Sequence, residues 1–237
     1  METKEFSDKK EKWLKEVADG CHDIAMKDPS YPDFYVFQSL IFEKPDLLIL
    51  GANPAGDKTY KQALADKSKE KGVDFSRRTK DDLINGENQY LANPDWAISK
   101  PVLAMFDEMI LRKSVVMNSV YFNTPDISGL SKFQADKKKM IDFSIYKTKE
   151  FIYEICKPKT VLFIGMNSPK WMGINFNHKE DTVLRSDDGF LIQEKKIQGI
   201  PHFLVHHTSR NYKFNTGTNL SLKREFFRSY LAKIDRS

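Results

Sequence analysis

Apolar runs and amphipathic stretches alternate along most of the chain. Short runs of apolar and β-branched residues predict buried strands at residues 46–50, 114–120, 160–164 and 203–205. Longer stretches, in which apolar side chains recur at helical spacing, predict helices at residues 96–111, 137–155 and 220–234. A further helix is expected to begin at Ser7, a good N-cap residue, and to end at Gly20. A polar turn predicts a hairpin of residues 182–184 with 190–193.

Strands that alternate with helices predict an α/β fold, specifically a three-layer α/β/α sandwich around a central, mostly parallel sheet. The chain has 237 residues and contains no internal repeat or Gly/Ser-rich linker, so we expect a single domain over residues 1–237. A long polar stretch at residues 57–95 shows no clear periodicity, and loops of this length are usually functional or mobile.

Composition excludes several classes of protein. No apolar run approaches the roughly 20 residues that span a bilayer, and the charged residues 1–15 do not form a signal peptide. The two cysteines, Cys21 and Cys156, lie far apart and in no metal-ligand spacing. We therefore expect a cytoplasmic protein with no membrane contact, no metal and no cofactor.

Charge favours an anionic partner only weakly. The 38 Lys and Arg residues against 33 Asp and Glu residues give a formal net charge of +5. Such a bias is compatible with nucleic acid binding, but many soluble proteins carry it without that function. The basic side chains within residues 57–80 either contact phosphates or are simply solvated, since acidic residues are interspersed among them.

The first candidate site follows the first predicted strand directly. Gly51 allows a sharp turn off the strand, and Pro54 stiffens that turn. Asn53 is thereby held in place with a carboxamide that can both donate to and accept from a water molecule. The alternative is an ordinary turn, in which Gly and Asn-Pro are common.

The second candidate site follows the last predicted strand, where residues 206–211 read His-His-Thr-Ser-Arg-Asn. Neighbouring side chains at a strand end point to opposite faces, so His206 and His207 are poorly placed to chelate one ion. A buried strand that ends in an Asn and another that ends in a His are typical of a site in an open α/β sheet. The alternatives are a satisfied core histidine and a solvated Arg210.

A third polar residue, Asn118, interrupts the β-type run at 114–120. A buried carboxamide needs partners for its donors and its acceptor. It either bridges backbone groups or awaits a ligand, and its paired donor and acceptor match the O4 and N3–H edge of uracil.

Together these segments resemble the uracil-DNA glycosylase superfamily, nearest to its single-strand-selective monofunctional and mismatch-specific branch. Gly51-Ala52-Asn53-Pro54 is similar to the Gly-Met-Asn-Pro or Gly-Ile-Asn-Pro water-activating motif of that branch. Residues 206–211, continued by Asn215 and Gly217, align without gaps on a His-Pro-Ser-Pro-Arg-Asn segment.

The resemblance implies a monofunctional DNA glycosylase that flips a deaminated base such as uracil out of DNA and hydrolyses its N-glycosidic bond. In this reading Asn53 positions the attacking water and His206 stabilises the departing base. An alignment shifted by one residue assigns the second role to His207 instead. Neither role uses a metal or cofactor, and we expect a monomer whose partner is DNA.

The resemblance also implies which residues bind the base. Gly51 and Ala52 line the base pocket, and Asn118 reads the pairing edge, with Asn123 as the second choice. Gly72-Val73-Asp74-Phe75 is similar to a Gly-Val-Pro-Phe segment whose Phe stacks on the flipped base, which assigns that role to Phe75.

The segment after the histidines is expected to contact DNA. In the branch that the chain resembles, this loop enters the duplex and fills the gap that the flipped nucleotide leaves. Arg210, Asn211 and Lys213, with the aromatic residues Tyr212 and Phe214 among them, suit that role because guanidinium groups meet phosphates and aromatic faces stack on bases.

The chain departs from the family pattern at several positions. Ala55 replaces a Gly, His207 and Ser209 stand where Pro is usual, and Thr208 replaces a Ser. These departures favour a second hypothesis, a superfamily member that has lost catalysis and only binds nucleic acid or a nucleobase. A third hypothesis is an unrelated α/β enzyme acting on a nucleotide-like small molecule, although no glycine-rich phosphate loop follows any predicted strand.

Overall fold

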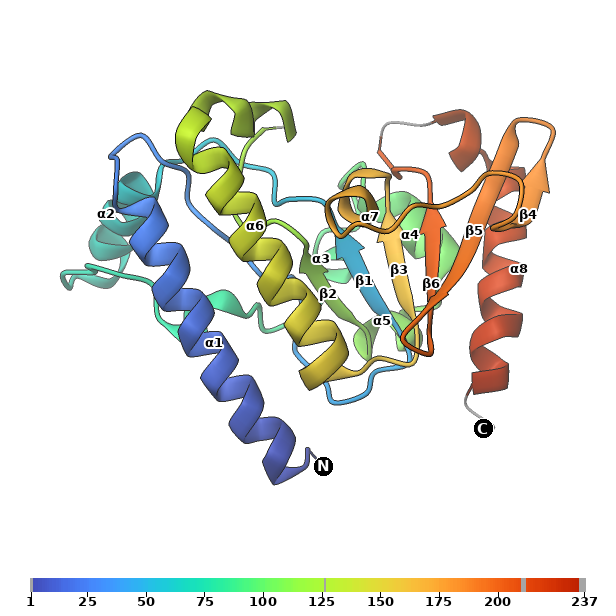
Figure 1. The fold of residues 1–237 in the computed structure, drawn as a ribbon, viewed down its shortest axis with the longest axis horizontal. Helices are drawn as coiled ribbons and strands as arrows, with labels where there is room; N and C mark the ends of the chain where they lie inside the picture. Colours follow the sequence, from blue (N-terminus) through green and yellow to red (C-terminus); the bar gives the residue numbers. More distant parts are fainter. Residues whose placement is uncertain (1, 126, 210–211, 235–237) are drawn as a thin grey trace.

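The computed structural model describes residues 2–125, 127–209 and 212–234. Its centre is one sheet in the order β2-β1-β3-β6-β5-β4 (Figure 1). The strands are β1 (Leu48–Gly51), β2 (Val115–Asn118), β3 (Val161–Ile164), β4 (Thr182–Ser186), β5 (Gly189–Ile197) and β6 (Ile200–Val205). β2, β1, β3 and β6 are parallel, whereas β5 and β4 run antiparallel to their neighbours.

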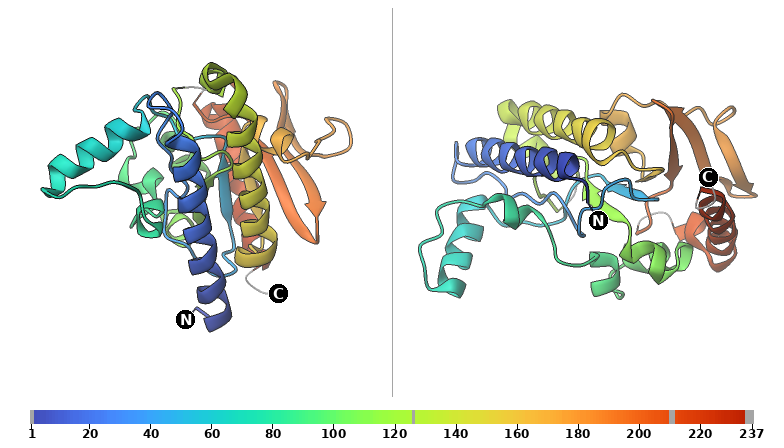
Figure 2. Two further views of the ribbon diagram at one scale, coloured as in Figure 1. Left: turned by 60° about the vertical axis from the view of Figure 1, so that its left-hand side comes forward. Right: turned by 90° about the horizontal axis from the view of Figure 1, so that it is seen from below.

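Helices cover both faces of this sheet (Figure 2). The longer helices are α1 (Lys4–Ala25), α2 (Tyr60–Lys71), α6 (Gln134–Glu150) and α8 (Gly217–Ile234). Shorter α-helices are α3 (Gln89–Ala92), α4 (Ser99–Met105), α5 (Glu108–Arg112) and α7 (Asn167–Trp171). Single turns and irregular helices are η1 (Lys80–Leu83), η2 (Ile127–Phe133), the π-helical η3 (Phe151–Cys156) and η4 (Tyr212–Asn215).

Alternating side chains of the central strands form two hydrophobic cores. Leu48 and Leu50 of β1 face α1, α6 and η3, where they pack near Trp13. Leu47 and Ile49 face the opposite layer, built from α3, α4, α5 and α8. The predicted three-layer α/β/α sandwich with a mostly parallel sheet is confirmed.

The helices differ from their predicted bounds, and the first shows the largest extension. α1 begins at Lys4, because Thr3 caps it by accepting from Phe6 N, and it runs past Gly20 to Ala25. A Cβ on Gly20 would lie 2.3 Å from Cζ of Phe143 in α6. This glycine therefore serves the close packing of two helices rather than ending one.

The helix predicted at residues 96–111 is divided into α4 and α5. Phe106 separates them in an extended conformation, with φ −126° and ψ 140°. Its ring packs 5.0 Å from that of Phe227 in α8, so burial of this side chain takes precedence over helix continuity.

The polar stretch at residues 57–95 contains more regular structure than its sequence indicates. Thr59 and Gln62 form a capping box at the start of α2, and Gly72 ends that helix in the left-handed conformation. α2 projects away from the sheet (Figure 2).

β5 and β6 form a hairpin that extends the sheet beyond its parallel part. Gln198 and Gly199 both have positive φ, 49° and 83°, as the tightest hairpin turns require. β6 consequently begins at Ile200, earlier than the predicted residue 203. Within the described ranges, no helix combines the length and apolar character that crossing a membrane requires.

Candidate active site at the carboxyl ends of the parallel strands

The loop after β1 carries the first predicted residues. Gly51 pairs in register with Asn118 of β2, and a Cβ on Gly51 would lie only 3.1 Å from Oδ1 of Asn118. The absence of a side chain at position 51 thus lets the two loop ends approach. Asn53 Nδ2 donates to Thr124 Oγ1 at 3.0 Å and to Pro54 O at 3.2 Å. Because these two oxygens hold Nδ2, Oδ1 is the atom of the carboxamide that is suited to accept a hydrogen bond from a water.

Asn118 ends β2 next to this loop and is 2% exposed. Its backbone N donates to Val36 O at 3.0 Å, but its Nδ2 has no hydrogen-bond partner among the described residues. An unpaired buried amide costs on the order of 1–3 kcal/mol. A ligand that offers an acceptor at this point would recover that cost.

Two serines that the sequence analysis missed hold the loop after β1 in place. Ser119 Oγ donates to Ala52 O at 2.9 Å, and Ser168 Oγ, at the start of α7, donates to Gly51 O at 3.0 Å. The two hydroxyl oxygens lie 2.9 Å apart. Gly165 follows the third apolar run just as Gly51 follows the first, which indicates a turn there, but the sequence does not indicate the role of either serine.

His206 turns toward β5, away from β3. Its ring stacks on Phe214 with centroids 3.6 Å apart and on Phe190 with centroids 4.0 Å apart. Its Nε2 lies 3.0 Å from Phe190 O. Burial lowers the pKa of His206 to about 4, so the ring is neutral at pH 7 and its one proton is on Nε2, donated to that carbonyl.

His207 lies on the other side, over the end of β3. Its Cβ is 3.4 Å from the point where Gly165 would carry a Cβ, so this glycine makes room for the imidazole. Ser209 N donates to His207 Nδ1 at 3.3 Å, and Ser209 Oγ lies 3.1 Å from the same atom. Because Nδ1 accepts, the proton of the neutral ring belongs on Nε2, which makes Nε2 a donor.

The two candidate loops meet at one turn of the chain. Ser168 contacts the loop after β1, and Gly165 contacts His207, so the turn at 165–168 touches both. β3 lies between β1 and β6 in the sheet. Since adjacent strands are about 4.8 Å apart, the ends of β1 and β6 are about 10 Å apart, close to the length of a nucleoside. The structure therefore brings Asn118 and the loops that carry Asn53 and His207 to one edge of the sheet.

The other predicted residues lie elsewhere. Phe75 packs beside α2, where Lys67 Nζ is 4.3 Å from its ring centroid and Ser68 Oγ accepts from its backbone N. Lys213 is exposed in η4, with Nζ 4.6 Å from the centroid of Phe214. Arg210 and Asn211 lie outside the described residues.

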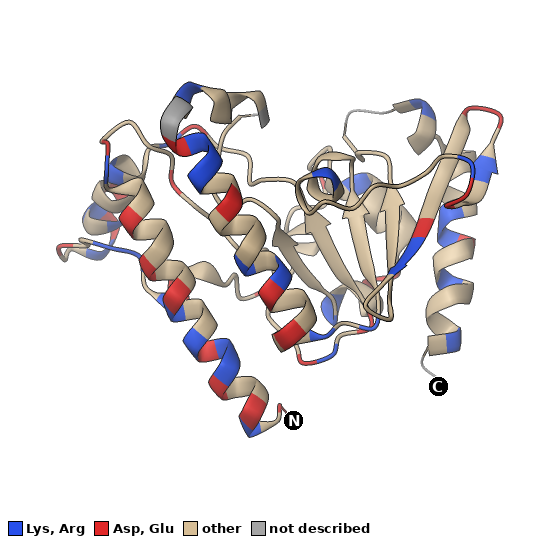
Figure 3. Cartoon of the chain, in the orientation of Figure 1, with Lys and Arg blue, Asp and Glu red and all other residues tan. Residues whose placement is uncertain are grey.

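Basic and acidic residues are interspersed along the polar stretch (Figure 3), and five of its cations form ion pairs. Arg78 forms an ion pair with Asp33, whose side chain is fully buried. Further pairs within the described residues are Lys58–Asp66, Lys67–Asp82, Arg77–Asp19 and Lys80–Glu11. These five cations join α1, α2, η1 and the segment before β1, and their ion pairs compete with phosphate contacts.

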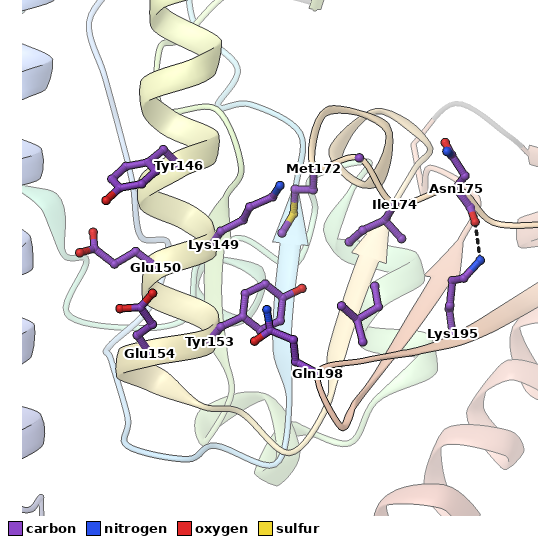
Figure 4. Close-up of a pocket in the computed structure, with 12 residues that line it drawn as sticks. Tyr146, Lys149, Glu150, Tyr153, Glu154, Met172, Ile174, Asn175, Lys195 and Gln198 are labelled. Atoms are coloured by element: carbon purple, nitrogen blue, oxygen red, sulfur yellow. Dashed lines mark hydrogen bonds between the residues drawn. The ribbon is translucent and has the colours of Figure 1, made fainter.

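Cavities on the described surface include one of about 660 Å³ and one of about 570 Å³. The larger, about 660 Å³, lies between α6, η3 and the β5–β6 hairpin (Figure 4), and none of the predicted residues lines it. The other, about 570 Å³, lies beside the loop after β1 and includes Gly56, Asn123 and Thr124. In the part of the chain that the structure describes, no group of three His, Cys, Asp or Glu side chains is placed to hold a metal ion.

Comparison with protein-family models and with curated proteins finds no match for this chain.

Proposed function

We propose that this protein hydrolyses the N-glycosidic bond of uracil, or of a related deaminated base, in DNA. One observation carries the proposal. The loop of Asn53 and the loop of His207 both touch the turn at 165–168, at the carboxyl edge of a parallel sheet. Ligands of open α/β sheets bind at this edge. A carboxamide and an imidazole on loops whose strands end about one nucleoside length apart suit hydrolysis in which neither side chain becomes covalently attached to the substrate.

The proposed chemistry divides between the two ends of the nucleoside. As the base departs, negative charge develops on its O2 and positive charge on the sugar. Nε2–H of His207 would donate to that oxygen, and a positioned donor of this kind typically contributes about 3–4 kcal/mol. Asn53 would hold the water that attacks C1′, acting by position, because an amide is a poor base.

The proposal assigns the leaving-group role to His207 in place of His206. Nε2 of His206 already donates to Phe190 O, and its ring lies between two phenylalanines. Nδ2 of Asn118 would donate to O4 of the base, which pairs a buried donor that has no partner among the described residues. Hydrolysis without a carboxylate base is expected to be slow.

The decisive experiment measures base release from oligonucleotides. A uracil-containing oligonucleotide, single- or double-stranded, is incubated with the protein and treated with alkali, which cleaves the strand at each abasic site. We expect cleavage at the uracil. Intact oligonucleotide in both forms would disprove the proposal.

Histidine variants test the assignment of roles. Asn53→Ala and His207→Ala are each expected to lower the single-turnover rate by about tenfold or more, a conservative value for a positioned catalytic group. His206→Ala should have a smaller effect, and the matched control His178→Ala, on an exposed loop, should have none. A larger loss in His206→Ala than in His207→Ala would reverse the assignment.

A second candidate function is nucleic acid binding without hydrolysis. It is favoured by the enclosure of Asn118, which is 2% exposed and would have to become accessible before it could read a base. Salt-sensitive binding of a uracil oligonucleotide with no release of uracil would select this candidate.

A further inference from the structure

The smaller cavity lies at the same end of the molecule as the candidate active site. Its volume is about 570 Å³, within the range of small-molecule sites. The walls come from the segment before β1, the later part of the loop after β1, the segment after β2, and η2. These segments are far apart in sequence, and the carboxyl ends of β1 and β2 bring them together (Figure 1).

Asn123 forms a polar wall of this cavity and is 3% exposed. Its Oδ1 accepts no hydrogen bond from the described residues, although the atom is buried. A Cβ on Gly56 would lie 2.5 Å from its Nδ2, so the glycine backbone packs directly against the amide. The side chain is therefore held firmly with an acceptor that lacks a donor, and an N–H group of a ligand would supply one.

The remaining walls favour an uncharged, planar ligand. Tyr31 and Phe133 form an edge-to-face pair with ring centroids 5.5 Å apart, which offers an aromatic surface for stacking. The cavity is lined by two lysines and two aspartates, Lys58, Lys132, Asp28 and Asp57, so its lining has equal numbers of positive and negative side chains. This balance suits a heterocyclic base better than a phosphate group.

Thr124 connects the cavity to the candidate active site. It lines the cavity, and its Oγ1 accepts from Asn53 Nδ2 at 3.0 Å. A Cβ on Gly129 would lie 2.9 Å from Cβ of Thr124, so this wall too is tightly packed. The cavity is therefore one side chain away from the residue that would hold the attacking water.

We infer that this cavity binds the base of the nucleotide next to the target, with Asn123 accepting a hydrogen bond from that base and Phe133 stacking on it. The inference rests on the proposed function, because it places the target nucleotide between Asn53 and His207. Two adjacent bases would then leave their stack and occupy two pockets joined by Thr124. The substrate is thereby defined as a dinucleotide step rather than a single damaged base.

The test uses single-stranded oligonucleotides with one 2′-fluorinated uracil nucleotide, whose glycosidic bond resists hydrolysis. Binding to the native protein is measured by fluorescence anisotropy for the intact oligonucleotide and for versions with a tetrahydrofuran abasic residue on the 5′ or the 3′ side of the uracil. We expect an abasic residue on one side to weaken binding about fivefold or more, the low end of the effect of stacking one base. The abasic residue on the other side should change binding much less.

Variants locate that effect in the cavity. Asn123→Leu and Phe133→Leu should each bind the intact oligonucleotide as weakly as the native protein binds the abasic version, and should no longer distinguish the two. The matched control, Asn175→Leu in the cavity of Figure 4, should behave as the native protein. If Asn123→Leu does not fold, Phe133→Leu and the oligonucleotide series still decide the question.

The outcomes separate this inference from the proposed function. Uracil release from ordinary substrates, with binding that is insensitive to both neighbours, would overturn the inference and leave the function standing. Neighbour-dependent binding without any uracil release would support the cavity as a nucleotide site and overturn the proposed hydrolysis.

Discussion

At the scale of single residues, the histidines differ in what their surroundings allow. His202 is fully buried in β6, with Nε2 3.0 Å from Tyr153 Oη and Nδ1 2.8 Å from Ile200 O. The carbonyl fixes the proton on Nδ1, so Nε2 accepts from the tyrosine. Burial lowers the pKa of His202 to about 4, and this residue is a structural histidine that is neutral at pH 7.

The low pKa of His202 predicts a specific loss of stability in acid. The unfolded chain binds a proton near pH 6.5, whereas the folded chain does so only near pH 4, so stability falls as pH decreases between these values. The contribution is about 3 kcal/mol at most. Urea unfolding at pH 7 and pH 4.5 should show a smaller pH-dependent loss in His202→Gln than in the native protein. Equal losses would contradict a neutral His202.

The strand-end residues could be found from sequence because they follow apolar runs directly, as Gly51 and His206 do. The direction of each imidazole could not, since His206 is placed by Phe190 of β5 and Phe214 of η4, and His207 by Gly165 at the end of β3. The roles of Ser119 and Ser168 were hidden for the same reason, because each serine pairs with a loop far from it in sequence.

At the scale of elements, α8 fixes the segment that follows β6. Lys223, fully buried, donates from Nζ to Phe214 O at 2.8 Å and to Asn215 Oδ1 at 3.0 Å. Asn215 Nδ2 in turn donates to the carbonyl oxygens of His207 and Thr208, each at 3.2 Å. Burial lowers the pKa of Lys223 to about 8. The helix thereby determines the backbone conformation at the candidate histidine.

Lys223→Met should loosen this segment. It removes two hydrogen bonds from a charged donor, each of which typically contributes about 1.5–3 kcal/mol. We expect amide hydrogen exchange at residues 207–209 to quicken by about tenfold or more, as followed by mass spectrometry. The control Lys233→Met, exposed at the end of the same helix, should exchange as the native protein does. Unchanged protection in Lys223→Met would show that the segment is held by other contacts.

Helix boundaries were predicted less well than strands. The apolar runs of the parallel strands are continuous because both faces of those strands are buried, which makes them visible in sequence. Gly20 was misread as a helix end, since only the α6 ring of Phe143 explains its presence inside α1. The division at Phe106 likewise depends on α8, which lies at the other end of the chain.

At the scale of the whole molecule, five cations of the polar stretch at residues 57–95 are held in ion pairs. The acids that pair with the cations of the polar stretch come from α1, α2, η1 and the segment before β1. The net charge of +5 therefore does not measure a surface available to DNA. Recognition is expected to depend on bases more than on the phosphate backbone.

This arrangement predicts a weak dependence of DNA binding on salt. Each phosphate contact with single-stranded DNA contributes about 0.7 to the slope of log K against log salt concentration, and we expect a slope of about 3 or less in magnitude. Anisotropy titrations at several salt concentrations measure it, with Lys80→Gln as a control that should leave the slope unchanged. A slope of about 6 or more would indicate a broad phosphate-binding surface.

Thr124 contributes to both sites. Its hydroxyl accepts a hydrogen bond from Asn53 Nδ2, and the residue also lines the smaller cavity. A ligand in that cavity would therefore affect the position of Asn53, which would hold the attacking water. The preference for a particular neighbouring nucleotide in the DNA and the rate of the proposed hydrolysis would not evolve independently in such a protein. A change that suits a different neighbouring nucleotide would also alter how fast the bond is cut.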